Sequence, residues 1–107
     1  MSQRAVLLVS TNPASLEQAD EYNAWYDDTH IPQMIERVPG FVSARRFEAH
    51  GASPVQPDQR YLVIYEVEVD TDPAEALAAL DEAMQEGKLD MSPALSPDAT
   101  LTLYRAR

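Results

Sequence analysis

Cysteine is absent from this 107-residue chain, which excludes both a disulfide framework and a thiolate metal site. Positive charge is scarce too, because 8 Lys and Arg stand against 18 Asp and Glu, for a formal net charge of −10. Nucleic-acid binding needs clustered basic side chains, so we expect no nucleic-acid partner. The only two histidines, His30 and His50, lie far apart, and no Gly-rich phosphate loop is present. We therefore expect neither a metal nor a cofactor.

Long hydrophobic runs are also absent. Met1 to Arg4 is followed by a short apolar run, Ala5 to Val9, which is too short for a signal peptide. No later segment approaches the about 20 consecutive apolar residues that a transmembrane helix needs, so we expect no membrane association and a cytoplasmic location. A chain of 107 residues has room for one core, and residues 1–107 are predicted to form a single domain.

Apolar periodicity predicts four strands, near residues 4–10, 41–50, 60–69 and 99–105. A first helix is predicted from Ser15, and a second from Pro73 behind an Asp72 cap. Pro32 interrupts the first helical pattern. Because the residue before a proline avoids the helical region, the backbone is predicted to turn near residues 29–31 and to resume as a short helical piece over 33–38.

The element order strand, helix, strand, strand, helix, strand is typical of a ferredoxin-like α+β domain, βαββαβ, with a four-stranded antiparallel sheet. Two helices cover only one face of such a sheet, yet the first and third strands carry apolar residues on both faces. Leaving about six such side chains uncovered would forgo on the order of 10 kcal/mol, which rivals the whole stability of a domain of this size. We therefore predict a homodimer in which sheet packs against sheet.

The segment from Tyr22 to Pro32 is the main candidate site, because it combines three aromatic rings, two carboxylates and a histidine at a helix-breaking proline. His30 shares the apolar stripe of the helix with Tyr22 and Tyr26. Asp27, three residues earlier, is expected to orient the His30 ring and to favour its protonated form, as a general acid or base needs. The alternative is a packed histidine whose nitrogens are satisfied by backbone or water.

Further aromatic side chains are candidates for substrate binding. Tyr22 and Tyr26 lie on the core stripe, which favours a structural role, while Trp25 lies off it and is expected at an interface or a pocket rim. Tyr61 and Tyr65 share one face of the third strand and would suit an aromatic or oxygen-bearing ligand if that face lines a cavity.

Arg45 and Arg46 point to opposite faces of the second strand, so one of them is expected to face inward. A buried guanidinium needs an anionic partner, and a ligand carboxylate or Glu48 would both serve. Of the two, Arg46 is our candidate for binding an anionic group of the substrate.

Three segments, NAWYDDTHIP (23–32), VPGF (38–41) and SARRF (43–47), resemble the EthD-like branch of the dimeric α/β barrel superfamily. The resemblance implies a ferredoxin-like protomer that closes into a barrel with a second copy. It also implies a cleft between the sheet and the first helix for small aromatic or lactone-like molecules. A histidine on or after this helix acts as base in several relatives, which maps onto His30, and a tyrosine before the acidic pair maps onto Tyr26.

Relatives of this branch include isomerases of muconolactone type, polyketide cyclases and cofactor-free monooxygenases. Some isomerase relatives employ a cysteine, which this chain lacks, while monooxygenases pair Asn and Trp with the histidine, for which Asn23 and Trp25 are available. We favour a small cofactor-independent enzyme that acts on an aromatic, lactone or polyketide-like molecule by proton transfer through His30, as an isomerase, cyclase or dehydratase. The alternatives are a non-catalytic homodimer that binds a small molecule and a cofactor-free monooxygenase.

Overall fold

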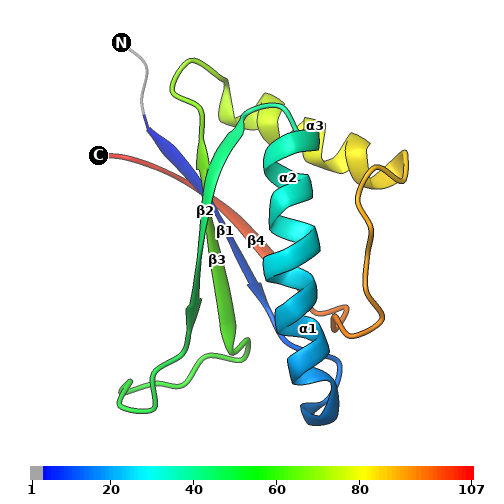
Figure 1. The fold of residues 1–107 in the computed structure, drawn as a ribbon. Coiled ribbons are helices and arrows are strands. Elements are labelled where there is room, and N and C mark those ends of the chain that lie inside the picture. The colour runs from blue at the N-terminus through cyan, green and yellow to red at the C-terminus, as the bar shows by residue number, and fades with distance from the viewer. Residues whose placement is uncertain (1–3) are drawn as a thin grey trace.

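The computed structural model describes residues 4–107, so Met1 to Gln3, which enter the argument about a signal peptide, lie outside the described residues. The chain forms four strands, a first helix that contains a π-helical turn, and a second helix (Figure 1). In order these are β1 (Ala5–Thr11), the 3₁₀ turn η1 (Leu16–Gln18), α1 (Ala19–Trp25), the π-helical turn η2 (Tyr26–His30), α2 (Ile31–Arg37), β2 (Phe41–Glu48), β3 (Tyr61–Val67), α3 (Pro73–Gln85) and β4 (Thr100–Arg105).

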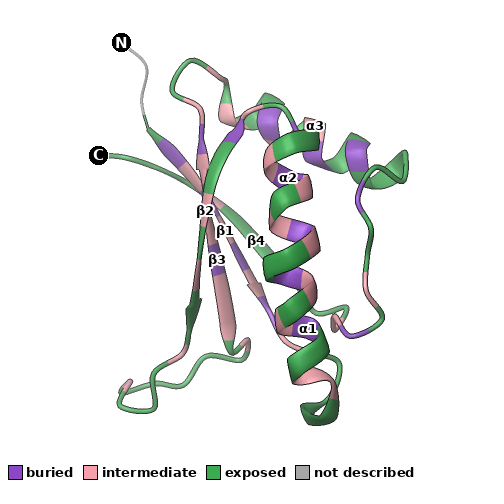
Figure 2. Cartoon of the chain, viewed as in Figure 1, coloured by how far each residue is buried: buried purple, intermediate pink, exposed green. Residues whose placement is uncertain are grey.

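The strands form one antiparallel sheet in the order β2-β3-β1-β4, which is the sheet of a ferredoxin-like fold. The predicted α+β class is confirmed. Figure 1 shows the α1–α2 helix and α3 on the same side of this sheet. Both helices carry buried residues (Figure 2), which join those of β1 and β3 in one core, and the buried positions of β1 alternate as the sequence pattern predicts. Leu7, Val63 and Tyr65 lie at the centre of the resulting core.

The predicted turn at residues 29–31 is wrong, because the helix runs without a break from Ala19 to Arg37 (Figure 1). Ile31, the residue before Pro32, has helical backbone angles of φ −62° and ψ −48°. The Ile31 N–H bonds to the carbonyl of Tyr26, five residues back, so the turn before the proline is π-helical. In this wider turn, the carbonyl four residues before Pro32 does not need an amide from it, and the proline is accommodated without a bend.

Helix α3 begins as predicted. The Asp72 side chain caps it by accepting a hydrogen bond from the Ala74 N–H at 2.9 Å, and Pro73 occupies its first turn. Gly87 follows the helix with a φ of 71°, a conformation that favours glycine. No helix within residues 4–107 is long and apolar enough to span a membrane.

The connection from α3 to β4 is hydrogen-bonded near both of its ends to residues in the first half of the chain. Near its start, the Asp90 carbonyl accepts from Trp25 Nε1 at 2.7 Å, and the Asp90 carboxylate accepts from the Gln33 amide at 2.8 Å. Near its end, the Ala14 N–H donates to Ala94 at 2.6 Å. The intervening residues therefore lie across the opening between the sheet and the helices.

Candidate functional site

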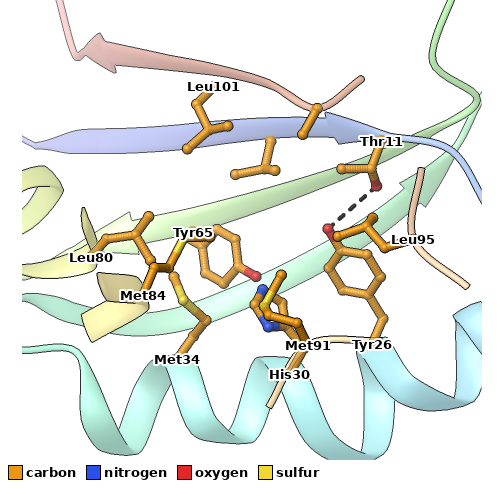
Figure 3. A pocket seen from close by; sticks show the side chains of 12 residues that line it. Thr11, Tyr26, His30, Met34, Tyr65, Leu80, Met84, Met91, Leu95 and Leu101 are labelled. Carbon is orange, nitrogen blue, oxygen red and sulfur yellow. Dashed lines mark hydrogen bonds between the residues drawn. The ribbon is translucent and has the colours of Figure 1, made fainter. Parts of the chain in front are cut away.

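A cavity of about 90 Å³ lies between the sheet, the first helix, α3 and the α3–β4 connection (Figure 3). Its wall is almost entirely apolar, and its polar groups come from Thr11, Tyr26, His30 and Tyr65. The lining residues are Val9, Thr11, Tyr26, His30, Met34, Tyr65, Leu80, Met84, Met91, Leu95, Ala99 and Leu101. The cavity lies on the helix-covered face of the sheet, where the resemblance implies a cleft.

His30 reaches this cavity from the π-helical turn η2, and its side chain is 9% exposed. Its Nδ1 atom is buried and has no hydrogen-bond partner among the described residues. The ring stacks on Trp25 at a centroid distance of 4.5 Å and meets the Tyr26 ring edge-on at 5.2 Å. Burial lowers the pKa of His30 from its ordinary value of 6.5 to about 4. The imidazole is therefore neutral at neutral pH, whereas the sequence argument expected a protonated ring.

The expected pairing of Asp27 with His30 is not found. Asp27 Oδ1 instead accepts from Arg46 Nη1 at 3.1 Å, and the Asp27 side chain is 60% exposed. The reason is the π-helical turn, which holds more residues than an α-helical one, so that positions three apart no longer share a face. Asp27 is thus outside the cavity that His30 lines.

Tyr65 supplies a second polar group to the cavity from β3. Its hydroxyl is buried without a hydrogen-bond partner among the described residues, and burial raises its pKa. Figure 3 shows this hydroxyl pointing toward the His30 ring. A phenol with a raised pKa stays protonated, so Tyr65 is an unused hydrogen-bond donor beside an imidazole that is an unused acceptor. Buried polar groups nearly always have hydrogen-bond partners, so two groups without partners at one cavity are unusual.

Thr11 is a functional candidate that the sequence argument missed. Its Oγ1 lies 2.5 Å from the Tyr22 hydroxyl and donates to the Tyr26 hydroxyl at 3.3 Å. All three side chains are buried, and burial raises the pKa of Tyr26 to about 12. The core position expected for Tyr22 and Tyr26 is therefore correct, although the Tyr26 hydroxyl also borders the cavity. Thr11 follows Leu7 and Val9 in the alternation of β1, and this pattern alone could have placed it inward.

Arg46 faces the helices, as expected, but it does not line the His30 cavity. Its Nη2 donates to Asn23 Oδ1 at 2.7 Å, and its guanidinium lies 4.7 Å from the centre of the Tyr26 ring. With Asn23 and Tyr61 it borders a separate, open pocket. The predicted site is thus divided: Tyr26, His30 and Tyr65 line one cavity, and Arg46, which packs against the Tyr26 ring, lines another pocket.

Trp25 and Asn23 take different places relative to His30. The Trp25 ring stacks on the His30 ring, and Trp25 Nε1 donates a hydrogen bond to the Asp90 carbonyl. Asn23 binds Arg46 and the carbonyl of Ala19, so it does not join Trp25 at the histidine. Within residues 4–107, no group of three His, Asp or Glu side chains is placed to hold a metal ion.

The neutral state of His30 predicts that the protein loses stability as the pH falls from about 6.5 to about 4. In this window, unfolded His30 takes up a proton with its ordinary pKa of 6.5, whereas folded His30, with a pKa of about 4, does not. The stabilisation is therefore complete above pH 6.5, and the loss by pH 4 is about 3 kcal/mol. Urea unfolding between pH 4 and 7.5 measures it. His30→Gln should have a shallower pH dependence than the wild-type protein, and identical slopes would contradict the assignment.

No protein-family model matches the chain, and no curated protein matches it. Among solved structures, it is similar over 100% of its length to a candidate monooxygenase from Shewanella loihica (97% of that chain, TM-score 0.61, 15% identity). It is also similar to an EthD family protein from Bacillus halodurans (98% and 99% of the two chains, TM-score 0.53, 17% identity). A third similar structure is a dimeric ferredoxin-like protein from an uncultured marine organism (99% and 96%, TM-score 0.52, 10% identity).

At such identities the likeness concerns the fold, and activity has to be argued from the site itself. The similar structures span nearly the whole chain, and they include both an EthD family protein and a dimeric ferredoxin-like protein. The resemblance stated from the sequence motifs is thus confirmed at the level of the fold: this chain has the ferredoxin-like fold found in EthD family structures.

Proposed function

We propose that this protein is a small cofactor-independent enzyme in which neutral His30 removes a proton from an aromatic, lactone or polyketide-like molecule. The observation that carries the proposal is the pair of buried, unpartnered polar groups, His30 Nδ1 and the Tyr65 hydroxyl, at one otherwise apolar cavity. An imidazole without a proton on one nitrogen is a base, and a protonated phenol is a donor to an oxygen that gains negative charge.

The chemistry follows from these two roles. His30 takes a proton from a carbon next to a carbonyl group, and the electron pair of the broken C–H bond moves onto the carbonyl oxygen. Tyr65 donates a hydrogen bond to this oxygen, which the apolar wall shields from water. The imidazolium then returns the proton to a different carbon in an isomerisation, or to a leaving oxygen in a dehydration. Although burial makes His30 a weak base, the enolate formed beside it stabilises the imidazolium charge.

The proposal is tested by exchange of the α-protons of methyl ketones and small lactones for deuterium in D₂O, followed by NMR. The protein is expected to accelerate this exchange over buffer alone, because exchange requires only the first proton transfer. Boiled protein and buffer of the same pH are the controls. Binding of these compounds without any acceleration would contradict the enzyme proposal and favour a non-catalytic binding protein.

We also propose that the protein is a homodimer whose uncovered sheet faces pack together. On this face Leu8 lies opposite Ile64, and Leu62 lies opposite Phe47, which is 45% exposed. The similar structure from the uncultured marine organism is described as dimeric, which supports the same arrangement here. Leu8, Leu62 and Ile64 are half-buried. Apolar side chains clustered on an uncovered face in this way are typical of protein interfaces.

Ile64→Asp is expected to convert the dimer into a monomer, because it places a carboxylate at the centre of the apolar face. Sedimentation velocity measures the mass, and far-UV circular dichroism checks that the fold is retained. Leu16→Asp is the matched control, since Leu16 is 94% exposed and lies on η1, away from the sheet. A wild-type protein that sediments as a monomer would rule out the dimer.

A further inference from the structure

The His30 cavity is too small to hold a whole substrate. Its volume of about 90 Å³ is well below the about 300–1,000 Å³ that is typical of ligand pockets. The cavity by itself therefore holds only the reacting end of a molecule.

A larger apolar groove continues from the cavity. It has a volume of about 590 Å³ and runs between α3 and the edge strand β4. Leu80, Met84 and Leu101 line both spaces, so the groove and the cavity share a wall. A ligand whose end lies beside His30 would thus extend along α3 without leaving apolar surroundings.

Three partly exposed side chains border the cavity, and two of them, Met84 and Leu101, also line the groove. Met84 and Met91 are 49% and 48% exposed, and Leu101 is 45% exposed, although all three line the cavity. Methionine side chains are unbranched and polarizable, so they change rotamer at low cost and pack against varied apolar shapes. These three side chains form a mouth that a ligand can widen.

Charge at the site disfavours an anionic ligand. Among residues 4–107, no side chain that lines the cavity carries a charge at neutral pH, and the one charged residue that lines the groove is Asp81, a carboxylate. The guanidinium of Arg46 packs against the Tyr26 ring and does not line the cavity; its Nη1 and Nη2 donate to Asp27 and Asn23, while its buried Nε has no partner among the described residues. Burying an unpaired carboxylate in the apolar cavity is costly, so an anionic group of the substrate is disfavoured in the cavity that His30 lines.

We infer that the ligand is an uncharged two-part molecule, with a carbonyl head in the cavity beside His30 and Tyr65 and an apolar tail in the α3–β4 groove. This inference rests on the proposed function and specifies its substrate class. It predicts that affinity grows with tail length until the groove is filled, by about fourfold for each methylene group, since each buried CH₂ is worth about 0.8 kcal/mol.

The experiment uses straight-chain methyl ketones from 2-butanone to 2-decanone. Binding is followed by the fluorescence of Trp25, the single tryptophan, which stacks on the His30 ring. Heptanoate, which has the size of 2-octanone but carries a carboxylate, is expected to bind more than about tenfold more weakly. Ala78→Phe fills the groove from an exposed position of α3 and should abolish the dependence on tail length while 2-butanone still binds. Ala24→Phe, at an exposed position of α1, is the matched control.

The outcomes separate the inference from the proposed function. If α-proton exchange is accelerated but affinity is the same for every tail length, the two-part ligand is wrong while the enzyme proposal holds. If affinity rises with tail length in the wild-type protein and not in Ala78→Phe, the inference holds whether or not exchange occurs. Tight binding of heptanoate would overturn the uncharged class. If a second copy of the chain occupies the groove, Ala78→Phe will have a lower mass than the wild-type protein, and its affinity will depend on tail length as in the wild type. This result also overturns the inference.

Discussion

His30→Gln is expected to reduce the protein-catalysed exchange of α-protons by about 10²–10⁴-fold, the contribution that a positioned general base makes to proton transfer. A glutamine amide occupies a similar volume and forms hydrogen bonds, yet it cannot accept a proton at neutral pH. Because His30 Nδ1 has no partner among the described residues, the substitution breaks no hydrogen bond of that atom. Loss of exchange would therefore report on chemistry and not on the fold.

The measurement is the exchange rate of 2-octanone in D₂O at equal protein concentration, with thermal unfolding as the check on structure. His50→Gln is the matched control, since His50 is the only other histidine and lies in an exposed loop, where Nδ1 accepts from the Ala52 N–H. It should exchange at the wild-type rate. An unchanged rate in His30→Gln would remove His30 from the mechanism.

Tyr65→Phe is expected to lower the exchange rate by about 10²–10³-fold, as removal of one oxyanion-stabilising donor does in other enzymes. The same substitution is expected to leave the protein at least as stable as the wild type. The Tyr65 hydroxyl is buried without a partner among the described residues, so its removal relieves a desolvation cost of about 1–3 kcal/mol and breaks no hydrogen bond. A gain in stability with a loss of activity is the signature of a group retained for function.

Exchange rates and urea unfolding midpoints of Tyr65→Phe and wild type provide the comparison. Tyr104→Phe is the control, because Tyr104 is exposed on β4 and its hydroxyl lies at the surface. If Tyr65→Phe destabilises the protein and leaves exchange unchanged, the hydroxyl has a structural partner, and Tyr65 has no part in the reaction.

The candidate residues do not share one cavity, because they are divided between the His30 cavity and the open pocket at Arg46. We predicted from the sequence that Arg46 and Tyr61 would belong to the same site as His30, although alternation along β2 could not indicate which of Arg45 and Arg46 faces the helices. In the structure Arg46 faces the helices and lies near Tyr61. Arg46 nevertheless lines a different pocket from His30, and periodicity carries no information about such a partition. Side-chain volumes in three dimensions decide which inward-facing groups share a cavity.

The π-helical turn at Tyr26–His30 changes which side chains of the candidate site contact one another. The sequence pattern was correct that Pro32 disturbs the helix, but it could not indicate whether the chain would bend or widen its turn. Widening kept the helix straight, moved Asp27 onto Arg46, and left His30 without a carboxylate partner. The neutral imidazole thus follows from one local change in hydrogen bonding.

The amino-acid sequence by itself determined the element order, the α+β class, the two-faced strands and the burial of His30, Tyr22 and Tyr26. These properties follow from period-2 and period-3.6 patterns and from capping residues, which act over a few neighbouring positions. Only the tertiary structure decided the partners of Asp27 and Arg46, the orphaned Tyr65 hydroxyl and the place of Met91 at the mouth of the cavity. Those properties depend on residues far apart in the chain, such as Asp90 and Trp25, which meet only when the α3–β4 connection packs against the first helix.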